Sequence, residues 1–378
     1  MMRVYLDNAA TTALDPEVLK AMLPIMQNGF GNPSSIHSYG RETRTVIEQA
    51  RKTVAKHLNA SPSEIFFTSG GTEANNMAIS CTIRDLGIKH AITSPIEHHA
   101  VLHTLEEQAR AGRIKLSLVQ VDGKGKINLA HLEELLANNE RTLVSLMHAN
   151  NELGNLLPLK KVGEICAKYN AIFHSDTVQT MGHYPFNLQD LNIHFITCAA
   201  HKFHGPKGVG FLYINSNVKI HPFIFGGVQE RNMRGGTENI YGIVGLARAL
   251  ELCYEHLPEH HAQIQHLKDY MTERLQENIH GVEFNGDTLG DSLYTVLNVS
   301  FPPTDIAEML LMNLDINGVA ASGGSACSSG SDVGSHVLTA LKVNPERPSV
   351  RFSFSKYSTK EEVDYAVEKL KEMFAVKV

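Results

Sequence analysis

The sequence of 378 residues has few cysteines and no long apolar run, and each absence excludes a class of protein. Its five cysteines are scattered and include no Cys-x-x-Cys pair, which argues against a disulfide framework and against a zinc knuckle. No apolar run reaches the roughly 18 residues that a membrane helix needs. The formal net charge of −6 provides no basic surface for nucleic acid or an anionic membrane. We therefore expect a globular protein that binds neither.

The N-terminal segment also lacks the pattern of a secretory signal. Residues 1–8 read as a strand instead, so we expect a cytoplasmic protein. The 20 histidines include the pairs His98/His99 and His201/His204, but neither pair has zinc-finger or metalloprotease spacing. No metal site is therefore expected. The dinucleotide-binding and Walker phosphate patterns are missing as well, which leaves both kinds of nucleotide unsupported.

What the sequence does have is a regular alternation of strands and helices. Short apolar segments separated by amphipathic helices are typical of a mostly parallel sheet that is covered on both faces. The predicted strands are 65–67, 90–96, 116–121, 143–148, 171–175, 195–200 and 209–214. The predicted helices are 15–28, 41–58, 72–86, 98–111, 129–138 and 159–169. This pattern predicts an α/β fold with a large seven-stranded sheet domain.

The last third of the chain has a different pattern. Two long helical stretches are expected at 237–256 and 259–279, with Pro258 between them. The segments after them read as a smaller α+β domain, with strands at 292–301 and 348–354 and helices at 305–314 and 359–374. We expect a large domain at 13–257 and a small domain formed by 1–12 and 258–378.

The apolar run from Phe195 to Ala200 ends abruptly at Lys202. It reads as a buried strand that delivers a lysine to the end of the sheet, where α/β folds place their ligands. A desolvated lysine loses its proton readily and suits Schiff-base chemistry, although a lysine just beyond a strand is usually a solvated loop residue. Lys207, in the following Gly-Pro-Lys-Gly turn, is the second candidate.

Other strand ends carry the groups that such a lysine would need. Residues 69–73 combine two glycines, a helix N-terminus and the Thr72 hydroxyl, which could hold an anion or form a plain strand-to-helix turn. Asp176 could cap a helix or keep a ring nitrogen protonated. His98 could stack on a ring and move protons. With a lysine added, these groups fit pyridoxal 5′-phosphate (PLP).

These groups belong to a longer series of motifs. The series comprises YLDNAATT (5–12), FGNPSS (30–35), FTSGGTEANN (67–76), EHHAV (97–101), MHANNELG (147–154), HSDTVQ (174–179), HKFHGPKG (201–208), RGGTEN (234–239), SGGSACSSGS (322–331) and VRFSFS (350–355). In content and order, the chain resembles a cysteine desulfurase of the nitrogen-fixation and iron–sulfur-cluster type. That family belongs to the class V aminotransferases, a group of fold-type I PLP-dependent transferases, and converts L-cysteine to L-alanine.

The resemblance implies roles for the matched residues around the ring. Lys202 resembles the lysine that binds PLP covalently, and Asp176 resembles the partner of the pyridine nitrogen. Gln179 matches the donor to the ring phenol oxygen. His98 matches the catalytic residue that stacks on the ring and transfers protons.

The resemblance also implies ligands for the phosphate and for the substrate. The matched phosphate ligands are Gly71, Thr72, His201 and Thr237. In this family the threonine comes from the other subunit, which implies a homodimer. Asn151 and Arg351 match the residues that hold the substrate carboxylate, and Asn151 is also counted among the cofactor contacts. A guanidinium suits this role because it binds a carboxylate through two parallel hydrogen bonds.

A second reactive centre is expected at Cys327. It lies in a run of small and polar residues that cannot pack, so its thiol should be exposed, whereas the other four cysteines have apolar neighbours. A thiolate is the nucleophilic form of cysteine, so some lowering of its pKa is expected. The resemblance implies that Cys327 takes the substrate sulfur as a persulfide and passes it to an acceptor protein, for iron–sulfur cluster assembly or other sulfur transfer.

One position departs from the family pattern. Ala199 stands where the family commonly has a serine that binds the phosphate. We therefore predict one missing phosphate hydrogen bond, unless water or Ser175 replaces it, and weaker retention of the cofactor.

Two alternative functions remain at this stage. A selenocysteine lyase or another class V aminotransferase would share Lys202, Asp176 and Arg351 but would not need Cys327. A non-catalytic sulfur-relay or scaffold-binding protein on the same fold would need neither the lysine nor the aspartate.

Overall fold

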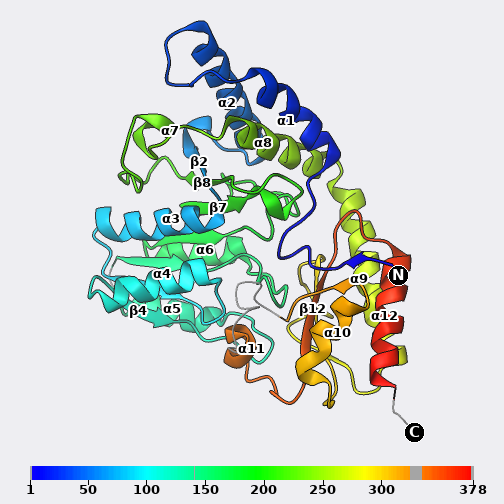
Figure 1. The fold of residues 1–378 in the computed structure, drawn as a ribbon. Coiled ribbons are helices and arrows are strands. Elements are labelled where there is room, and N and C mark those ends of the chain that lie inside the picture. The colour runs from blue at the N-terminus through cyan, green and yellow to red at the C-terminus, as the bar shows by residue number, and fades with distance from the viewer. Residues whose placement is uncertain (1, 140, 324–333, 376–378) are drawn as a thin grey trace.

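A seven-stranded sheet forms the centre of the larger part of the protein (Figure 1). The computed structural model describes residues 2–139, 141–323 and 334–375. The strand order is β2-β8-β7-β6-β5-β3-β4, and only β8 runs antiparallel to its neighbours. The strands are β2 (Ile65–Thr68), β3 (His90–Thr93), β4 (Lys115–Leu118), β5 (Thr142–Ser145), β6 (Ile172–Asp176), β7 (Phe195–Ala199) and β8 (Gly210–Ile214). The predicted α/β fold with a mostly parallel sheet is confirmed.

Helices cover both faces of this sheet. The helices are α1 (Pro16–Asn28), α2 (Ser38–His57), α3 (Gly71–Asp85), α4 (His99–Arg110), α5 (Leu129–Ala137), α6 (Leu159–Lys168), α7 (Gln229–Asn232) and α8 (Ile240–Glu255). Apolar residues of α3 and α4 pack on one face, and those of α1, α2, α5, α6 and α8 pack on the other. This double cover explains why β6, β7 and β8 are almost continuously apolar: nearly every side chain in them is buried.

The smaller part is built from both ends of the chain. Its helices are α9 (Leu257–Asn278), α10 (Leu310–Ile316), α11 (His336–Ala340) and α12 (Lys360–Phe374), and its strands are β1 (Val4–Tyr5), β9 (Glu283–Phe284), β10 (Val296–Ser300), β11 (Val319–Ala320) and β12 (Ser349–Ser353). Strands β12, β10 and β9 form an antiparallel sheet, and β1 pairs with β11. One core cluster joins Val4 and Leu6 to apolar residues of α9, α10 and α12. The division at residues 12/13 and 257/258 stays a prediction.

Several predicted boundaries shift by a few residues. Helix α2 begins at Ser38 rather than at residue 41, because His37 caps it through a ring nitrogen that accepts from the Gly40 amide. The helix expected from 237 begins at Ile240, and Asn239 caps it. Helix α9 begins at Leu257, so Pro258 lies in its first turn, where no intrahelical amide is needed. The helix expected at 305–314 spans Leu310–Ile316, after a short 3₁₀ turn.

Two expectations from composition can be compared with the structure. The cysteines Cys81, Cys166, Cys198 and Cys253 are free and buried in the core, as predicted. No helix in the part of the chain that the structure describes is long and apolar enough to cross a membrane.

Candidate active site

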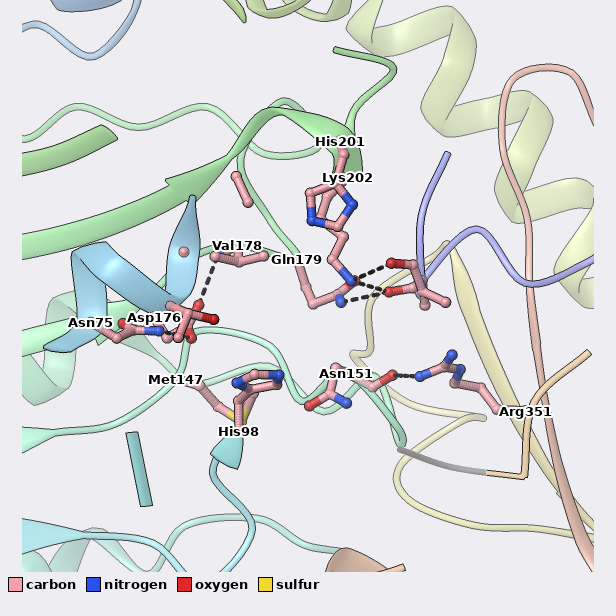
Figure 2. Close-up of a pocket in the computed structure, with 15 residues that line it drawn as sticks. Asn75, His98, Met147, Asn151, Asp176, Val178, Gln179, His201, Lys202 and Arg351 are labelled. Carbon is pink, nitrogen blue, oxygen red and sulfur yellow. Dashed lines mark hydrogen bonds between the residues drawn. The ribbon is translucent and has the colours of Figure 1, made fainter. Parts of the chain in front are cut away.

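One cavity of about 230 Å³ lies where β2, β6 and β7 end (Figure 2). It is lined by Ala9, Ala10, Gly71, Thr72, Asn75, His98, Met147, Asn151, Asp176, Val178, Gln179, Ala199, His201, Lys202 and Arg351. Among the residues that the structure describes, the lining therefore includes every predicted site residue except Thr237. Figure 2 shows Asp176 and Asn75 on one side, Arg351 and Asn151 on the opposite side, and Lys202 and His98 between them.

Strand β7 places Lys202 in the cavity. All five of its residues are buried, and a single 3₁₀ turn, Ala200–Lys202, follows it. The Lys202 ammonium donates hydrogen bonds to the carbonyl oxygens of Ala9 at 2.5 Å and Ala10 at 2.9 Å (Figure 2). Lys207 does not line this cavity and lies along an adjoining hollow beside Gly70 and Thr72.

The Asp176 carboxylate lies at the end of β6 and is 5% exposed. One oxygen accepts from the Asn75 side-chain amide at 2.7 Å, and the other accepts from the Val178 backbone amide at 3.0 Å. These two bonds fix the carboxylate plane. Each carboxylate oxygen can accept a second hydrogen bond, so the group keeps capacity for a donor inside the cavity.

His98 lies in the cavity as a neutral ring. It is the N-cap of α4, and its Nδ1 atom accepts a hydrogen bond from the Ala100 amide at 3.1 Å. The ring proton therefore sits on Nε2. Burial lowers the pKa of His98, Lys202 adds to this effect, and the Asp176 carboxylate opposes it. A neutral imidazole can both stack on a ring and accept a proton.

A third wall of the cavity can hold an anion. Helix α3 begins at Gly71 with no side-chain cap, so amide groups of its first turn remain available as donors. A Cβ atom at Gly71 would lie 2.7 Å from Cγ2 of Val178, so the helix approaches the Asp176–Gln179 turn this closely only with glycine at that position. Burial, together with smaller effects of Lys202 and Lys207, lowers the pKa of His201 to about 4, so its ring is a neutral donor or acceptor.

Arg351 closes the opposite side of the cavity. It lies on β12 of the smaller part and is 1% exposed. One terminal nitrogen donates to the Asn151 carbonyl oxygen at 2.9 Å, and the other donates to the Asp7 carboxylate at 2.8 Å. Among the described residues its Nε atom has no hydrogen-bond partner, although it is buried. An unpaired buried donor is costly, so this guanidinium has capacity for an acceptor of its own.

One predicted residue, Thr237, lies in another part of the chain. Thr237 lines a separate cavity of about 130 Å³ with Glu230 and Arg234, so it does not reach the first cavity within one chain. The prediction for Cys327 lies outside the described residues. Ser175 does not line the first cavity, and its buried hydroxyl has no hydrogen-bond partner in the part that the structure describes. Its replacement of the serine missing at position 199 stays a prediction.

Sequence reasoning missed two residues of this site. Asn75 orients Asp176, and Asp7 holds one edge of Arg351. Both lie in motifs that carry the resemblance, FTSGGTEANN and YLDNAATT. Each of the two is a polar residue near the end of an expected strand or helix, and this position was the only local indication of a role. The partner of Asn75 lies 101 positions away in the sequence, and the partner of Asp7 lies 344 positions away.

The family model described as "Aminotransferase class-V" matches residues 4–366. The chain belongs to the class-V aminotransferase family. It is 44% identical over 371 residues to "Cysteine desulfurase IscS" of Dictyoglomus turgidum, a match that covers 97% of this chain and 93% of the relative. The resemblance stated from the motifs is thereby confirmed.

Solved structures of similar proteins have the same fold. A structure titled "NIFS-LIKE PROTEIN" is 40% identical, with a TM-score of 0.90 and coverage of 98% of this chain and 99% of the other. A structure titled "SspA in complex with cysteine" is 33% identical, with a TM-score of 0.82 and coverage of 94% and 100%. These likenesses confirm the fold-type I PLP-enzyme architecture for this class-V aminotransferase.

PLP is the cofactor of this family, and the cavity of this class-V aminotransferase fits it. The chemistry of the donor set matches the groups of PLP: an amine for its aldehyde, a carboxylate for its pyridine nitrogen and an uncapped helix end for its phosphate. The roles of the individual residues stay predictions. Among the described residues, no group of three His, Cys, Asp or Glu side chains is arranged to hold a metal ion.

Proposed function

We propose that this chain is a PLP-dependent cysteine desulfurase, which converts L-cysteine to L-alanine and transfers the sulfur to Cys327 as a persulfide. The observation that carries the proposal is the placement of Lys202, Asp176 and Arg351 around one cavity of a class-V aminotransferase. The relatives support it, because those named above include a cysteine desulfurase and a protein whose structure is titled as a cysteine complex.

Lys202 would hold the cofactor, and Asp176 would keep a proton on the pyridine nitrogen. When bound, PLP supplies an electron sink for charge that is released at the substrate Cα atom. Gln179 already donates a hydrogen bond to the Ala9 carbonyl at 3.1 Å, which holds its amide at the cavity wall for the phenol oxygen. Gly71, Thr72 and His201 would bind the phosphate.

Arg351 and Asn151 would orient L-cysteine. The guanidinium is fixed by Asp7 and by the Asn151 carbonyl, so little conformational entropy is lost when it binds the substrate carboxylate. Lys202 would also be the base that removes the substrate Cα proton. His98 would be the acid/base residue, and its Nε2–H presents a donor to the same cavity that Asn151 lines.

The sulfur step balances without any outside oxidant. The Cys327 thiolate attacks the substrate sulfur, a sulfur–sulfur bond forms, and the bond between Cβ and sulfur breaks. The electron pair of that bond stays with the carbon skeleton, which gains protons and leaves as L-alanine. Each sulfur is oxidised by one electron and Cβ is reduced by two, so one cysteine yields one alanine and one persulfide.

The cofactor and the reaction are tested on the purified protein. Wild type should be yellow, and borohydride should bleach it and attach the cofactor irreversibly, while Lys202→Ala should not be labelled. With L-cysteine and a thiol reductant, alanine and sulfide should form in equal amounts. A colourless protein that borohydride leaves unchanged would favour a non-catalytic relay protein. Activity on selenocysteine alone would favour a selenocysteine lyase.

We also propose that the protein is a cytoplasmic homodimer in which Thr237 completes the partner's phosphate site. Thr237 lies in a cavity separate from the one that contains Lys202 of the same chain, and this position supports the assignment. Complementation tests it: in a mixed dimer of Lys202→Ala and Thr237→Ala chains, one site would have both residues intact. Recovery of activity on mixing supports the proposal, whereas no recovery in a dimer shown to exchange chains contradicts it. A sulfur-acceptor protein, such as an iron–sulfur scaffold or a tRNA-thiolation enzyme, is the expected partner.

A further inference from the structure

The chain on either side of segment 324–333 is attached to the walls of the active-site cavity. On the N-terminal side, Ser322 pairs with the backbone of Arg351 through two hydrogen bonds, of 3.2 and 2.6 Å. On the C-terminal side, Ser335 and His336 bind Glu152 and Glu97, the sequence neighbours of Asn151 and His98. Each attachment therefore involves a predicted site residue or its immediate neighbour. Helix α11, which starts at His336, lies beside the larger part (Figure 1), and its Val337 packs against Ile96 and Leu153.

The Ser335 hydroxyl makes two bonds of different kinds. It accepts from the Leu338 amide at 3.1 Å and so caps α11. It donates to Oε2 of Glu152 at 2.5 Å. The first bond is local to the helix, whereas the second joins residues 183 positions apart. Substitutions can separate the two bonds, because some residues can cap a helix and yet cannot donate to a carboxylate.

Glu152 is a buried acceptor for this bond. It is 0% exposed, and burial raises the pKa of its carboxyl group, while Ser335, His336 and Arg351 oppose the rise. Its backbone amide donates to the Asn150 side chain at 2.9 Å, and its carbonyl oxygen accepts from Asn298 at 3.1 Å. Asn298 is the cross-strand partner of Arg351 in β10–β12. Glu152 thus belongs to the same turn as Asn151 and touches the strand pair that carries Arg351.

His336 makes a second attachment beside the first. Its Nε2 atom donates to the Glu97 carbonyl oxygen at 2.9 Å, and its ring lies 4.5 Å from the His99 ring. Glu97 precedes His98, and its buried carboxyl group accepts from Ser94 and from the Met147 amide. His336 therefore joins the start of α11 to the wall that holds His98 and Met147.

We propose that Ser335 and Glu152 are positioning residues for sulfur transfer, and that their hydrogen bond sets where the chain leading back to Cys327 leaves the cavity wall. The inference rests on the proposed function, because it needs Cys327 as the sulfur acceptor. Cys327 lies eight residues before Ser335 in the sequence. Loss of the bond should slow the step that needs Cys327 and spare the steps that need only Lys202, Asp176 and Arg351.

Two rates measured on the holoenzyme separate these steps. The first is the single-turnover rate of persulfide formation with L-cysteine, measured by mass spectrometry of the protein. The second is the exchange of the Cα hydrogen of L-alanine in D₂O, which needs the cofactor but has no sulfur to transfer. Ser335→Ala should slow the first rate about tenfold, as expected for one lost hydrogen bond to a charged group, and leave the second within about twofold.

Matched variants separate the contact with Glu152 from helix capping. Ser335→Thr retains both bonds and should behave as wild type. Ser335→Asp still caps α11 but places a carboxylate against Glu152, so it should be at least as slow as Ser335→Ala. Glu152→Leu should slow persulfide formation, and the double variant Ser335→Ala/Glu152→Leu should be no slower than the slower single variant, because both remove one contact.

Three outcomes would overturn the inference: a Ser335→Asp variant as fast as wild type, an equal loss of both rates in Ser335→Ala, or additive effects in the double variant. A different result is expected if the proposed function itself is wrong. In that case Cys327→Ala would still release sulfide at the wild-type rate, whatever the Ser335 variants do.

Discussion

Replacement of Arg351 by lysine tests the proposed substrate site while keeping its charge. The Arg351 guanidinium is 1% exposed and is held by Asp7 at 2.8 Å and by the Asn151 carbonyl at 2.9 Å. A lysine ammonium at this depth cannot form two parallel bonds to a carboxylate. One or two charge-assisted hydrogen bonds to L-cysteine should be lost, at about 1.5–3 kcal/mol for a single bond.

Loss of a single bond, about 1.5–3 kcal/mol, corresponds to a fall of roughly 10- to 150-fold in kcat/KM for L-cysteine, and loss of both bonds to a larger fall, since about 1.4 kcal/mol is a factor of ten. Initial rates of alanine formation over a range of L-cysteine concentrations measure this fall. The absorption spectrum of the bound cofactor should stay unchanged, because Arg351 lies on the side of the cavity opposite Asp176 (Figure 2).

Arg347→Lys is the matched control. Arg347 precedes the same strand, is also largely buried and binds the Gly281 and Ser300 carbonyl oxygens, but it does not line the cavity. It should lower the free energy of unfolding and leave kcat/KM within about twofold of wild type. If Arg351→Lys kept wild-type kcat/KM, or if Arg347→Lys lost as much, the assignment of the carboxylate site would be wrong.

Three further predictions follow from other groups. Asp176→Asn removes the buried anion and should lower kcat for alanine formation by more than about 100-fold. A smaller loss would contradict a catalytic role for the Asp176 carboxylate, which Asn75 and Val178 orient. Ala199→Ser should tighten PLP binding, measured as cofactor retained on dialysis, and unchanged retention would refute the predicted missing phosphate bond. Burial lowers the pKa of Lys268 from 10.5 to about 8 in the folded protein, so wild type should gain up to about 3 kcal/mol of stability as the pH rises from 8 to 10.5. Stability rises with pH because the unfolded chain binds the Lys268 proton more tightly than the folded protein does. Methionine does not titrate, so denaturant titrations of Lys268→Met should lack this gain in stability. An equal gain in both proteins would contradict the prediction.

The central part of the fold could be predicted because its strands are buried on both faces. An apolar segment such as Phe195–Ala199 must lie inside a sheet with helices on each side, and this fixes the fold class. Polar residues directly after such strands, such as Asp176 and Lys202, then fall at one edge of the sheet. The cavity contains both of these residues.

Local sequence patterns could not predict the long-range contacts of the site or the shortest helices. The contact between Arg351 and Asp7 joins opposite ends of the chain, and neither residue has a neighbour that signals the pairing. Helices α7 and α11 span only 4 and 5 residues, too few for a hydrophobic period, and Glu230 and Arg231 of α7 have positive φ angles that tertiary contacts impose. The Glu230 carboxylate, for example, is held by Arg51, 179 positions earlier.

The most direct test of sulfur transfer to Cys327 is the rate at which wild type and Cys327→Ala form alanine and sulfide from L-cysteine. Wild type should form equal amounts of both products. Cys327→Ala should form neither at more than about one hundredth of that rate, although it keeps the yellow cofactor. Sulfide and alanine formed by Cys327→Ala at the wild-type rate would contradict the transfer of sulfur to this chain.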